Sequence, residues 1–438
     1  MRREEILEIL SDWNFWRKQI DTGIKREEYV KKAVEFLESN MIICITGIRR
    51  AGKSYIMRQI AEELIKNNVG KNEVLIVNFE DRRFSDFSPK ILDEIFETYI
   101  EYLNPKGKPY IFLDEVHRVE KWERWVRTLN ELGKAKIIVS GSTSQLIKRE
   151  FSTLLTGRHL DIPVFPLSFK EFLSFKEVEI RDSLDLVEKK IEIKRALKEY
   201  LEFGGFPEVA LSKSKKEILL SYFDDVLTKD IFQRYKVRKI NQLESLARFY
   251  LTNISNPITF RSIEKFINIS SDTVEKFSYY LEEVGLLFFI RRFSPKVKEQ
   301  EKSPRKVYSI DVGLSNAIGF KLSENLGSIA ENVVAVELKR WKTKNPLIDI
   351  FYWRSYDGKE VDFVVKENFK VNKLIQVCWN ISDEKTRKRE VKGLIKAMEE
   401  FRLKKGLIIT EDYEGREEIN KKVIEYIPLW KWLLSLNS

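Results

Sequence analysis

The sequence predicts an α/β protein that begins with a parallel β-sheet covered by helices on both faces and continues into a helical region and a second α/β region. Short apolar runs alternate with helical stretches from Met41 to Phe165, the order that a parallel sheet with crossover helices requires. The sequence then becomes helical and charged, and short apolar runs return only after Gly285. With 438 residues, 43% of them apolar and 33% charged, the chain has the composition of a large folded protein, and its length suggests about two to four domains.

The strands of both sheets are predicted by short apolar runs. The first sheet is expected from MIICIT at Met41, VLIVNFE at Val74, YIFLDE at Tyr110, KIIVSGS at Lys136 and LDIPVF at Leu160. Residues 1–38 precede it as amphipathic helices, with Trp13, Phe15 and Trp16 as an aromatic anchor. The paired glycines and proline of FGGFPE, at 203–208, force a loop in the helical region. Later strands are expected from LLFFIRR at Leu286, KVYSID at Lys306, IFYW at Ile350, EVDFVV at Glu360, KLIQVCW at Lys373 and GLIIT at Gly406.

Composition also excludes several classes of protein. No apolar run approaches the roughly 18 residues of a membrane span, and the first residues, MRREEILEIL, are too charged for a signal peptide. We therefore expect a cytoplasmic protein without membrane contact. The two cysteines, Cys44 and Cys378, lie far apart and belong to no CxxC or Cys/His cluster, which excludes a disulfide framework and a zinc site. Any metal must be bound by oxygen ligands.

A phosphate-binding loop is predicted directly after the first strand. The pattern G-x-x-x-x-G-K-[ST] is matched by Gly47, Ile48, Arg49, Arg50, Ala51, Gly52, Lys53 and Ser54. The glycines let backbone N–H groups surround phosphate oxygens at the start of the helix that continues through Tyr55. Lys53 is expected to reach the β- and γ-phosphates of ATP, and the Ser54 hydroxyl is expected to bind Mg²⁺.

Two carboxylates follow the third strand of the first sheet. Asp114 and Glu115 end the run YIFLDE, and a parallel sheet presents its ligands at this carboxyl edge. Asp114 is expected to hold the Mg²⁺ shell, while Glu115 orients or deprotonates the attacking water. An ordinary strand ending in solvated acids is the alternative interpretation.

Two further candidates come from the segment after the carboxylates. Ser140 or Ser142, at the end of KIIVSGS, is expected to hydrogen-bond the γ-phosphate or the attacking water. Capping of the helix that begins near Ser144 is the alternative role for these serines. Arg158 is a candidate arginine finger that a neighbouring subunit presents to the γ-phosphate, and an ordinary surface arginine is its alternative.

The order of GIRRAGKS, LDEVHRVEKW, SGSTSQLI, LLTGR, FPLSFKEF and FGGFPE resembles a prokaryotic branch of AAA+-like P-loop ATPases, often called archaeal ATPases. The resemblance covers nearly the whole chain. It implies an ASCE-type sheet in which the Ser140 strand lies between the phosphate-loop strand and the Asp114 strand. It also implies a winged helix and a C-terminal domain related to PD-(D/E)xK nucleases. The expected domains are N-terminal helices at 1–38, the P-loop ATPase domain at 39–175, a helical lid at 176–240, a winged helix at 241–310 and a nuclease-like domain at 311–438.

The middle of the chain carries most of the net positive charge. The whole chain has a net charge of +10, and the 16 basic and 9 acidic residues at 229–306 contribute +7 of it. Residues 260–267 and 273–285 are predicted to form a helix-turn-helix, with Ser271 or Asp272 as the cap of the second helix. Arg291 to Lys306 would form a basic wing. The phosphate contacts expected from this wing are Lys296, Lys298, Lys302, Arg305 and Lys306. DNA is therefore the expected partner, and rigid docking of a protein is the alternative.

The C-terminal segment resembles a nuclease in layout but departs from it in chemistry. Glu331 and Asp362 stand where a PD-(D/E)xK nuclease has its helical Glu and strand Asp. Gln376 and Cys378 replace the second carboxylate and the lysine, and a neutral amide and a thiol are poor substitutes for them. We therefore predict a scaffold without nuclease activity.

The function predicted from these features is a Mg²⁺-dependent ATPase that acts on DNA, in the form of a homo-oligomeric motor on duplex or branched DNA. Two alternatives remain. One is a STAND-like switch that closes on ATP and docks a protein partner, and the other is an ATP-powered nuclease, which Gln376 and Cys378 argue against.

Overall fold

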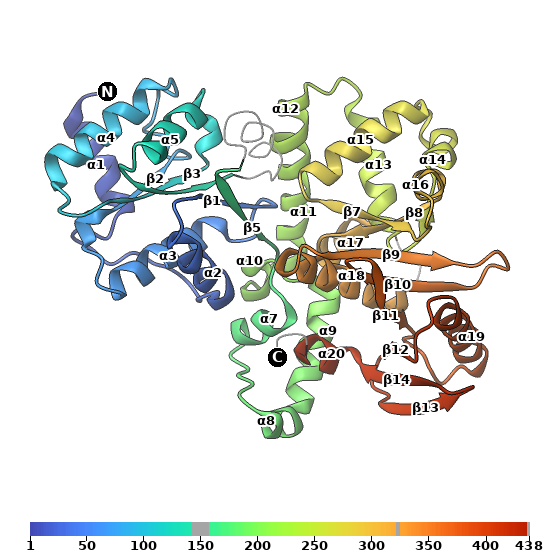
Figure 1. Ribbon diagram of the computed structural model, residues 1–438. Coiled ribbons are helices and arrows are strands. Elements are labelled where there is room, and N and C mark those ends of the chain that lie inside the picture. Colours follow the sequence, from blue (N-terminus) through green and yellow to red (C-terminus); the bar gives the residue numbers. More distant parts are fainter. Residues whose placement is uncertain (142–156, 321–324, 436–438) are drawn as a thin grey trace. The chain divides into compact units, whose positions relative to one another are not determined.

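The computed structural model describes residues 1–141, 157–320 and 325–435 (Figure 1). The chain forms two compact units, Met1–Phe165 and Pro166–Ser438. Each has its own sheet.

The first unit is built on a five-stranded sheet. Its strands are β1 (Ile42–Gly47), β2 (Val74–Asn78), β3 (Tyr110–Asp114), β4 (Lys136–Ser140) and β5 (His159–Val164). The strand order is β2-β3-β4-β1-β5, and every pairing is parallel. The predicted position of the Ser140 strand, between β1 and β3, is confirmed. The carboxyl ends of β1, β3 and β4 therefore share one edge, where the phosphate loop begins.

Helices cover both faces of this sheet. They are α1 (Arg3–Trp13), α2 (Glu27–Leu37), α3 (Lys53–Lys66), α4 (Lys90–Leu103) and α5 (Trp122–Glu131). Helices α1, α4 and α5 share one apolar core with alternate strand residues such as Cys44, Leu75 and Val139. Helices α2 and α3 pack together and contact β1 from the other side of the sheet (Figure 1).

The aromatic anchor predicted near the N-terminus packs onto this unit. The Trp13 indole donates to Asp81 Oδ2 at 2.9 Å, and the Trp16 indole donates to the Val74 carbonyl at 2.9 Å. The N-terminal helices are thus an integral layer of the first unit.

The described helices of the second unit lie before, between and after its strands along the chain. They are α7 (Phe169–Phe175), α8 (Ser183–Glu188), α9 (Lys190–Phe203), α10 (Pro207–Leu211), α11 (Lys215–Asp225), a π-helix at Val226–Phe232, α12 (Gln233–Tyr235), α13 (Ile240–Thr252), α14 (Phe260–Ile267), α15 (Ser271–Glu283), α16 (Val297–Lys302), α17 (Val312–Ile318), α18 (Leu326–Lys344), α19 (Glu384–Glu400) and α20 (Leu429–Ser435).

A mixed nine-stranded sheet runs through the second unit. Its strands are β6 (Pro257–Ile258), β7 (Leu287–Arg292), β8 (Arg305–Ser309), β9 (Ile348–Arg354), β10 (Glu360–Glu367), β11 (Lys370–Val377), β12 (Lys405–Thr410), β13 (Gly415–Ile419) and β14 (Lys422–Pro428). Their order is β13-β14-β12-β11-β10-β9-β7-β8-β6. Strands β6, β13 and β14 were not expected from the sequence, because they lack the short apolar runs that mark the other strands.

The pairing of β7 with β9 joins the predicted winged-helix region to the C-terminal region. Arg291 and Arg292 pair in parallel with Phe351 and Tyr352, while β7 pairs with β8 on its other side. The predicted limits at 175, 240 and 310 all fall inside the second unit, so they stay predictions as boundaries of smaller domains. The predicted wing at 291–306 connects β7 to β8, which pair antiparallel within the nine-stranded sheet.

The FGGFPE loop, between α9 and α10, is held by Asp311. Gly205 N–H donates to Asp311 Oδ2 at 2.6 Å, and Gly313 N–H donates to Oδ1 at 2.9 Å. A Cβ atom at Gly204, whose φ is 75°, would lie 1.9 Å from Asp311 Oδ1, so only glycine fits there. Burial raises the pKa of Asp311 to about 6, although these backbone N–H bonds oppose the shift.

Candidate active site

The phosphate loop connects β1 to α3 as predicted. Gly47 and Gly52 have φ values of 142° and 95°, and a Cβ atom at Gly47 would lie 2.2 Å from the Val164 carbonyl oxygen. Glycine is therefore required for the loop to pass close to β5. The loop ends at the N-terminus of α3, a terminus that favours anions such as phosphate.

Lys53 is the first residue of α3 and is only 5% exposed. Its ammonium donates to the carbonyl oxygens of Gly47 and Ile48, each at 3.1 Å. It therefore lies against the loop that would hold the phosphates. A bound phosphate would offer it anionic oxygens, which make stronger hydrogen bonds than neutral carbonyls.

The other predicted nucleotide-binding residues differ in exposure. The side chains of Ile48 and Ala51 are apolar and buried. A phosphate group could therefore contact these two residues only through their backbone. Arg50 has a left-handed backbone, with φ at 68°, and Arg49 pairs with Glu80 at 3.4 Å. Ser54 is partly buried. Tyr55 is 44% exposed, and the Arg58 guanidinium lies 5.1 Å from the centre of its ring.

Asp114, Glu115 and Ser140 lie together at the carboxyl edge of the sheet. The Glu115 N–H donates to Ser140 Oγ at 3.1 Å, and the Ser140 hydroxyl donates to Asp114 Oδ1. All three side chains are buried. Glu115 has a left-handed backbone, with φ at 53°, which turns the chain immediately after β3. Ser140 thus links the predicted metal ligand to the predicted base.

Burial raises the pKa of Glu115 to about 7. The charge of Lys53 opposes this shift, whereas the neighbouring Asp114 and Glu80 reinforce it. A carboxylate with this pKa can gain or lose a proton near neutral pH, as general base catalysis requires. His117 is a neighbour that sequence analysis missed, and its Nδ1 lies 3.3 Å from Glu115 Oε2. Its position two residues after Glu115, in a tight 3₁₀ turn, is the only sequence signal for this contact.

The donor atoms fit ATP with Mg²⁺. The hydroxyl of Ser54 and the carboxylate of Asp114 are hard oxygen ligands of the kind that Mg²⁺ prefers, and the loop leads into the N-terminus of α3, which favours phosphate. Among residues 1–141, 157–320 and 325–435, no three His, Cys, Asp or Glu side chains converge in a way that could hold a metal ion. Phosphate and water oxygens would therefore have to complete the Mg²⁺ shell.

Ser142 and the helix start near Ser144 lie outside the described residues, so the roles predicted for them stay predictions. Arg158 is described, and its guanidinium pairs with Glu131 at the end of α5. The Ile42 N–H donates to the Arg158 carbonyl at 3.0 Å, so Arg158 lies where β1 begins. The phosphate loop begins at Gly47, the other end of β1. The distance along the strand from Ile42 to Gly47 is about 17 Å, at about 3.3 Å for each of the five residue steps. Arg158 is thus at the edge of the sheet opposite its own phosphate loop.

A cluster of charged side chains fills the predicted nuclease-like region. Lys306, on β8, is 2% exposed, and its ammonium contacts Glu331 at 3.0 Å, Glu360 at 2.7 Å and Asp362 at 2.9 Å. The Tyr308 hydroxyl donates to Glu331 Oε1 at 2.7 Å. Two expectations are therefore wrong. Lys306 was expected to contact DNA phosphates, but its side chain is buried. The nuclease-like region was expected to lack a lysine because Cys378 replaces it, but Lys306 places an ammonium group beside Asp362.

Gln376 also belongs to this cluster. Its Oε1 accepts from the Asp362 N–H at 3.1 Å, and its amide donates to Glu390 Oε2 at 2.7 Å. Gln376 therefore holds the backbone of Asp362 in place. Cys378 lies just after β11, and burial raises the pKa of its thiol to about 11, which keeps the thiol neutral.

The helix-turn-helix forms as predicted, with one correction. Ser270 caps α15 by accepting the Thr273 N–H at 3.4 Å, in place of Ser271 or Asp272. The reason is that Asn268, with φ at 56°, ends α14 and lets the chain extend through Ser270. The apolar face predicted for α15 is buried, and it consists of Val274, Phe277, Leu281 and Val284.

The wing contains helix α16 and several ion pairs. Arg291 and Arg305 both pair with Glu301, and Lys296 pairs with Glu299 at 3.3 Å. Lys298 and Lys302, the two remaining lysines of the predicted set, are exposed on α16. The positive charge available to a polyanion is therefore smaller than the sequence suggests.

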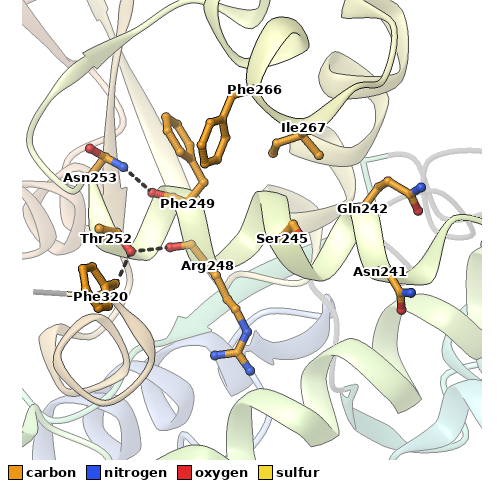
Figure 2. A pocket seen from close by; sticks show the side chains of 10 residues that line it. All are labelled: Asn241, Gln242, Ser245, Arg248, Phe249, Thr252, Asn253, Phe266, Ile267 and Phe320. Atoms are coloured by element: carbon orange, nitrogen blue, oxygen red, sulfur yellow. Dashed lines mark hydrogen bonds between the residues drawn. The ribbon is translucent and has the colours of Figure 1, made fainter.

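A groove of about 710 Å³ lies beside the helix-turn-helix (Figure 2). Its lining residues come from α13, α14 and the segment after α17, and they are Asn241, Gln242, Ser245, Arg248, Phe249, Thr252, Asn253, Phe266, Ile267 and Phe320. Phe266 is 72% exposed and its ring is tilted against that of Phe249, with ring centres 5.5 Å apart. The Phe320 N–H donates to the Thr252 hydroxyl at 3.0 Å. The groove contains none of the residues of the phosphate site.

The parallel sheet, the glycine loop at a helix N-terminus and the paired carboxylates on the adjacent sheet edge define an AAA-type P-loop ATPase. Family comparison agrees. An AAA domain model matches residues 39–173, and two models of domains of unknown function, DUF8612 and DUF4143, match residues 194–325 and 326–432.

Whole-chain comparison places the protein in one family. The chain is 34% identical over 428 residues to the uncharacterized protein MJ1544 of Methanocaldococcus jannaschii, covering 94% of this chain and 92% of that relative. It therefore belongs to the family of AAA-type ATPases that includes MJ1544. An uncharacterized protein of Haemophilus influenzae is 28% identical over 421 residues, with 94% and 98% coverage. A Walker-type ATPase of Pyrococcus abyssi, PABY2304, is similar in structure, with a TM-score of 0.42 and 16% identity over 70% of this chain and 99% of that chain.

None of the described helices combines the length and the apolar character needed to cross a bilayer.

Proposed function

We propose that the first unit hydrolyses ATP with Mg²⁺ and that Glu115 is the base that activates the attacking water. The observation that carries this proposal is the buried carboxylate of Glu115, placed next to Asp114 at the edge of the sheet where the phosphate loop begins, and its raised pKa is consistent with this role. Lys53 would neutralise the β- and γ-phosphates, and Ser140 would keep Asp114 and Glu115 in position through its two hydrogen bonds. Mg²⁺ supplies charge neutralisation at the phosphates when it is bound.

Two substitutions test this assignment because they remove different functions. Lys53→Ala should weaken ATP binding, since it removes a cation from the phosphate cradle. Glu115→Gln should bind ATP normally and lower the turnover number by about 100-fold or more. Glu120→Gln is the matched control, since Glu120 is exposed and lies after the same strand. Calorimetric affinity and phosphate release should be measured on all three variants. An equal loss of affinity in Lys53→Ala and Glu115→Gln would exclude the role given to Glu115.

We propose further that the active form is a homo-oligomer in which Arg158 of one copy completes the site of the next. Support comes from the position of Arg158 at the sheet edge opposite its own phosphate loop, since a guanidinium there can approach a γ-phosphate only in another copy. Its ion pair with Glu131 is exposed, with 44% and 41% of the two side chains accessible, so it costs little to exchange for a phosphate.

Action on DNA is our proposal for the second unit. It is supported by the helix-turn-helix and by Lys298 and Lys302 on the exposed surface of α16. DNA affinity should fall with salt, with a slope of about −0.9 on logarithmic axes for each phosphate contacted. Replacing Lys296, Lys298 and Lys302 together should flatten this slope and leave basal ATP turnover unchanged.

A nucleotide-dependent switch that docks a protein is the second candidate. The ion pairs of the wing, the burial of Lys306 and the exposed Phe266 and Phe320 of the groove favour it. ATP turnover with and without double-stranded, single-stranded and four-way-junction DNA separates the two candidates. Stimulation by one DNA form supports DNA action, whereas binding that is absent or independent of salt supports the switch.

A further inference from the structure

The covalent connection between the two units is held by one buried arginine from each unit. The units divide between Phe165 and Pro166. In the first unit, the Arg26 guanidinium donates to the Phe165 carbonyl at 3.1 Å. In the second unit, both terminal nitrogens of Arg340 donate to the Pro166 carbonyl at 3.2 Å. Arg26 is 3% exposed and Arg340 is 5% exposed, so neither bond is an incidental surface contact.

Arg26 also holds the phosphate loop. The same Arg26 nitrogen donates to the Ala51 carbonyl at 2.9 Å, and Ala51 lies between the two loop glycines. Tyr29 supports this arrangement, since its ring lies 4.5 Å from the Arg26 guanidinium and its hydroxyl accepts the Phe165 N–H at 3.2 Å. Gln59 fixes the Arg26 backbone from α3. One guanidinium therefore joins the loop that receives phosphate to the last residue of the first unit.

Arg340 carries the connection into the second unit. It lies on α18, where its Nε pairs with Glu337 at 3.1 Å. The same helix carries Glu331 of the Lys306 cluster. Pro166 has no N–H and a fixed φ angle. Rotation about φ of Pro166 therefore cannot absorb a displacement of the Phe165 carbonyl. A displacement of the Phe165 carbonyl would therefore be passed to α18 through Pro166 and Arg340.

We propose that Arg26 and Arg340 form a two-sided clamp that transmits the nucleotide state of the phosphate loop to the second unit. Phosphate binding draws the loop N–H groups toward the ligand, and this changes the direction of the Ala51 carbonyl. Arg26 must follow its acceptor, because a buried guanidinium that loses a hydrogen bond pays a large desolvation cost. Its second acceptor is the Phe165 carbonyl, so the shift reaches the connection. The clamp rests on the proposed ATP binding. It adds the path by which ATP binding at the phosphate loop changes the second unit.

The test measures the distance between spin labels, one on each unit, with and without ATP and Mg²⁺. Leu132→Cys and Tyr356→Cys provide the labelling sites, because these side chains are 61% and 103% exposed. The native Cys44 and Cys378 are buried and will label poorly. Glu115→Gln in the same chain keeps ATP intact. We expect ATP to shift the distance distribution in this parent protein.

Arg26→Met and Arg340→Met should each reduce that shift to less than about half, while Arg340→Met changes the ATP affinity by less than about threefold. Arg181→Met is the matched control, since Arg181 is an arginine of the second unit with 79% of its side chain exposed, and it should leave the shift intact. Arg340 does not touch the phosphate loop, so this variant remains decisive if Arg26→Met also weakens ATP binding. A full shift in Arg340→Met overturns the clamp. A parent protein that binds ATP without any change in the spin-label distance also overturns the clamp, but it does not contradict the proposed ATPase activity. A parent protein that does not bind ATP refutes the proposed function itself.

Discussion

Replacing Lys306 by methionine should destabilise the second unit strongly, and more so at high pH. The Lys306 ammonium is 2% exposed and lies within 3.0 Å of oxygens of Glu331, Glu360 and Asp362. Removing one partner of a buried ion pair costs about 3–5 kcal/mol, because the other charge stays buried without compensation. Three carboxylates lose the same cation here, so we expect a loss within this range at about pH 9.

The pH dependence follows from the same contacts. Burial and the neighbouring Asp362 raise the pKa of Glu331 to about 8, and Lys306 opposes this shift. Without Lys306 the pKa of Glu331 should rise further. The carboxylates then take up protons in the folded state as the pH falls, and protonation removes their repulsion. The loss of stability should therefore be largest above the raised pKa and should shrink toward about pH 6.

Hydrogen exchange of β10 measures the effect locally. A loss of about 3–5 kcal/mol corresponds to exchange that is about 150- to 4,000-fold faster in Lys306→Met than in the parent at the same pH. Lys302→Met, on the exposed surface of α16, should leave exchange unchanged. Adding Glu331→Gln to Lys306→Met should recover part of the protection of β10 from exchange, since it removes one buried carboxylate that has lost its cation. Unchanged protection of β10 at about pH 9 would refute the reasoning. An equal loss of protection at about pH 9 and about pH 6 would refute it as well.

Three further predictions concern catalysis. First, kcat/KM for ATP should rise with pH through about 7, because Glu115 acts as a base only when it is ionised; a flat profile would contradict this role. Second, Arg158→Ala should bind ATP without hydrolysing it, and mixing it with Glu115→Gln protein should restore some activity in composite sites. Full activity of the Arg158→Ala protein alone would exclude a role in trans. Third, the protein should not cleave linear, nicked or branched DNA with any divalent cation, because the neutral amide of Gln376 stands where a nuclease has its second metal-binding carboxylate. Cleavage that Asp362→Ala abolishes would reverse that conclusion.

The phosphate site was predictable because its parts are local. The glycines, Lys53 and Ser54 are contiguous, and their chemistry depends on a strand before them and a helix after them. Asp114 and Glu115 could be placed on the same edge because all strands of a parallel sheet end there. His117 was missed because only the tight turn after Glu115 brings it back to that carboxylate.

The charged wing was predicted less well. Charge counting treats every lysine and arginine as available, whereas the fold pairs Arg291 and Arg305 with Glu301 and buries Lys306. The capping residue of α15 shifted by one or two positions because the left-handed Asn268 decides where the turn ends.

The sequence by itself determined the α/β class, the strands of the first sheet and the residues of the phosphate loop, because each depends on short-range pattern and backbone conformation. The place of the Ser140 strand between β1 and β3 was implied by the family resemblance, and the rest of the strand order came from the structure. Only the tertiary structure decided the contents of the C-terminal cluster. Lys306 and Asp362 are 56 residues apart, and their contact depends on β7 and β9 pairing in the middle of one sheet. Lys306 and Tyr308 then point to the same side of β8, because side chains alternate along a strand, and both reach Glu331. A missing residue in a linear motif can thus be supplied from another strand of the same sheet, since a charged cluster needs the right groups in space and not in sequence.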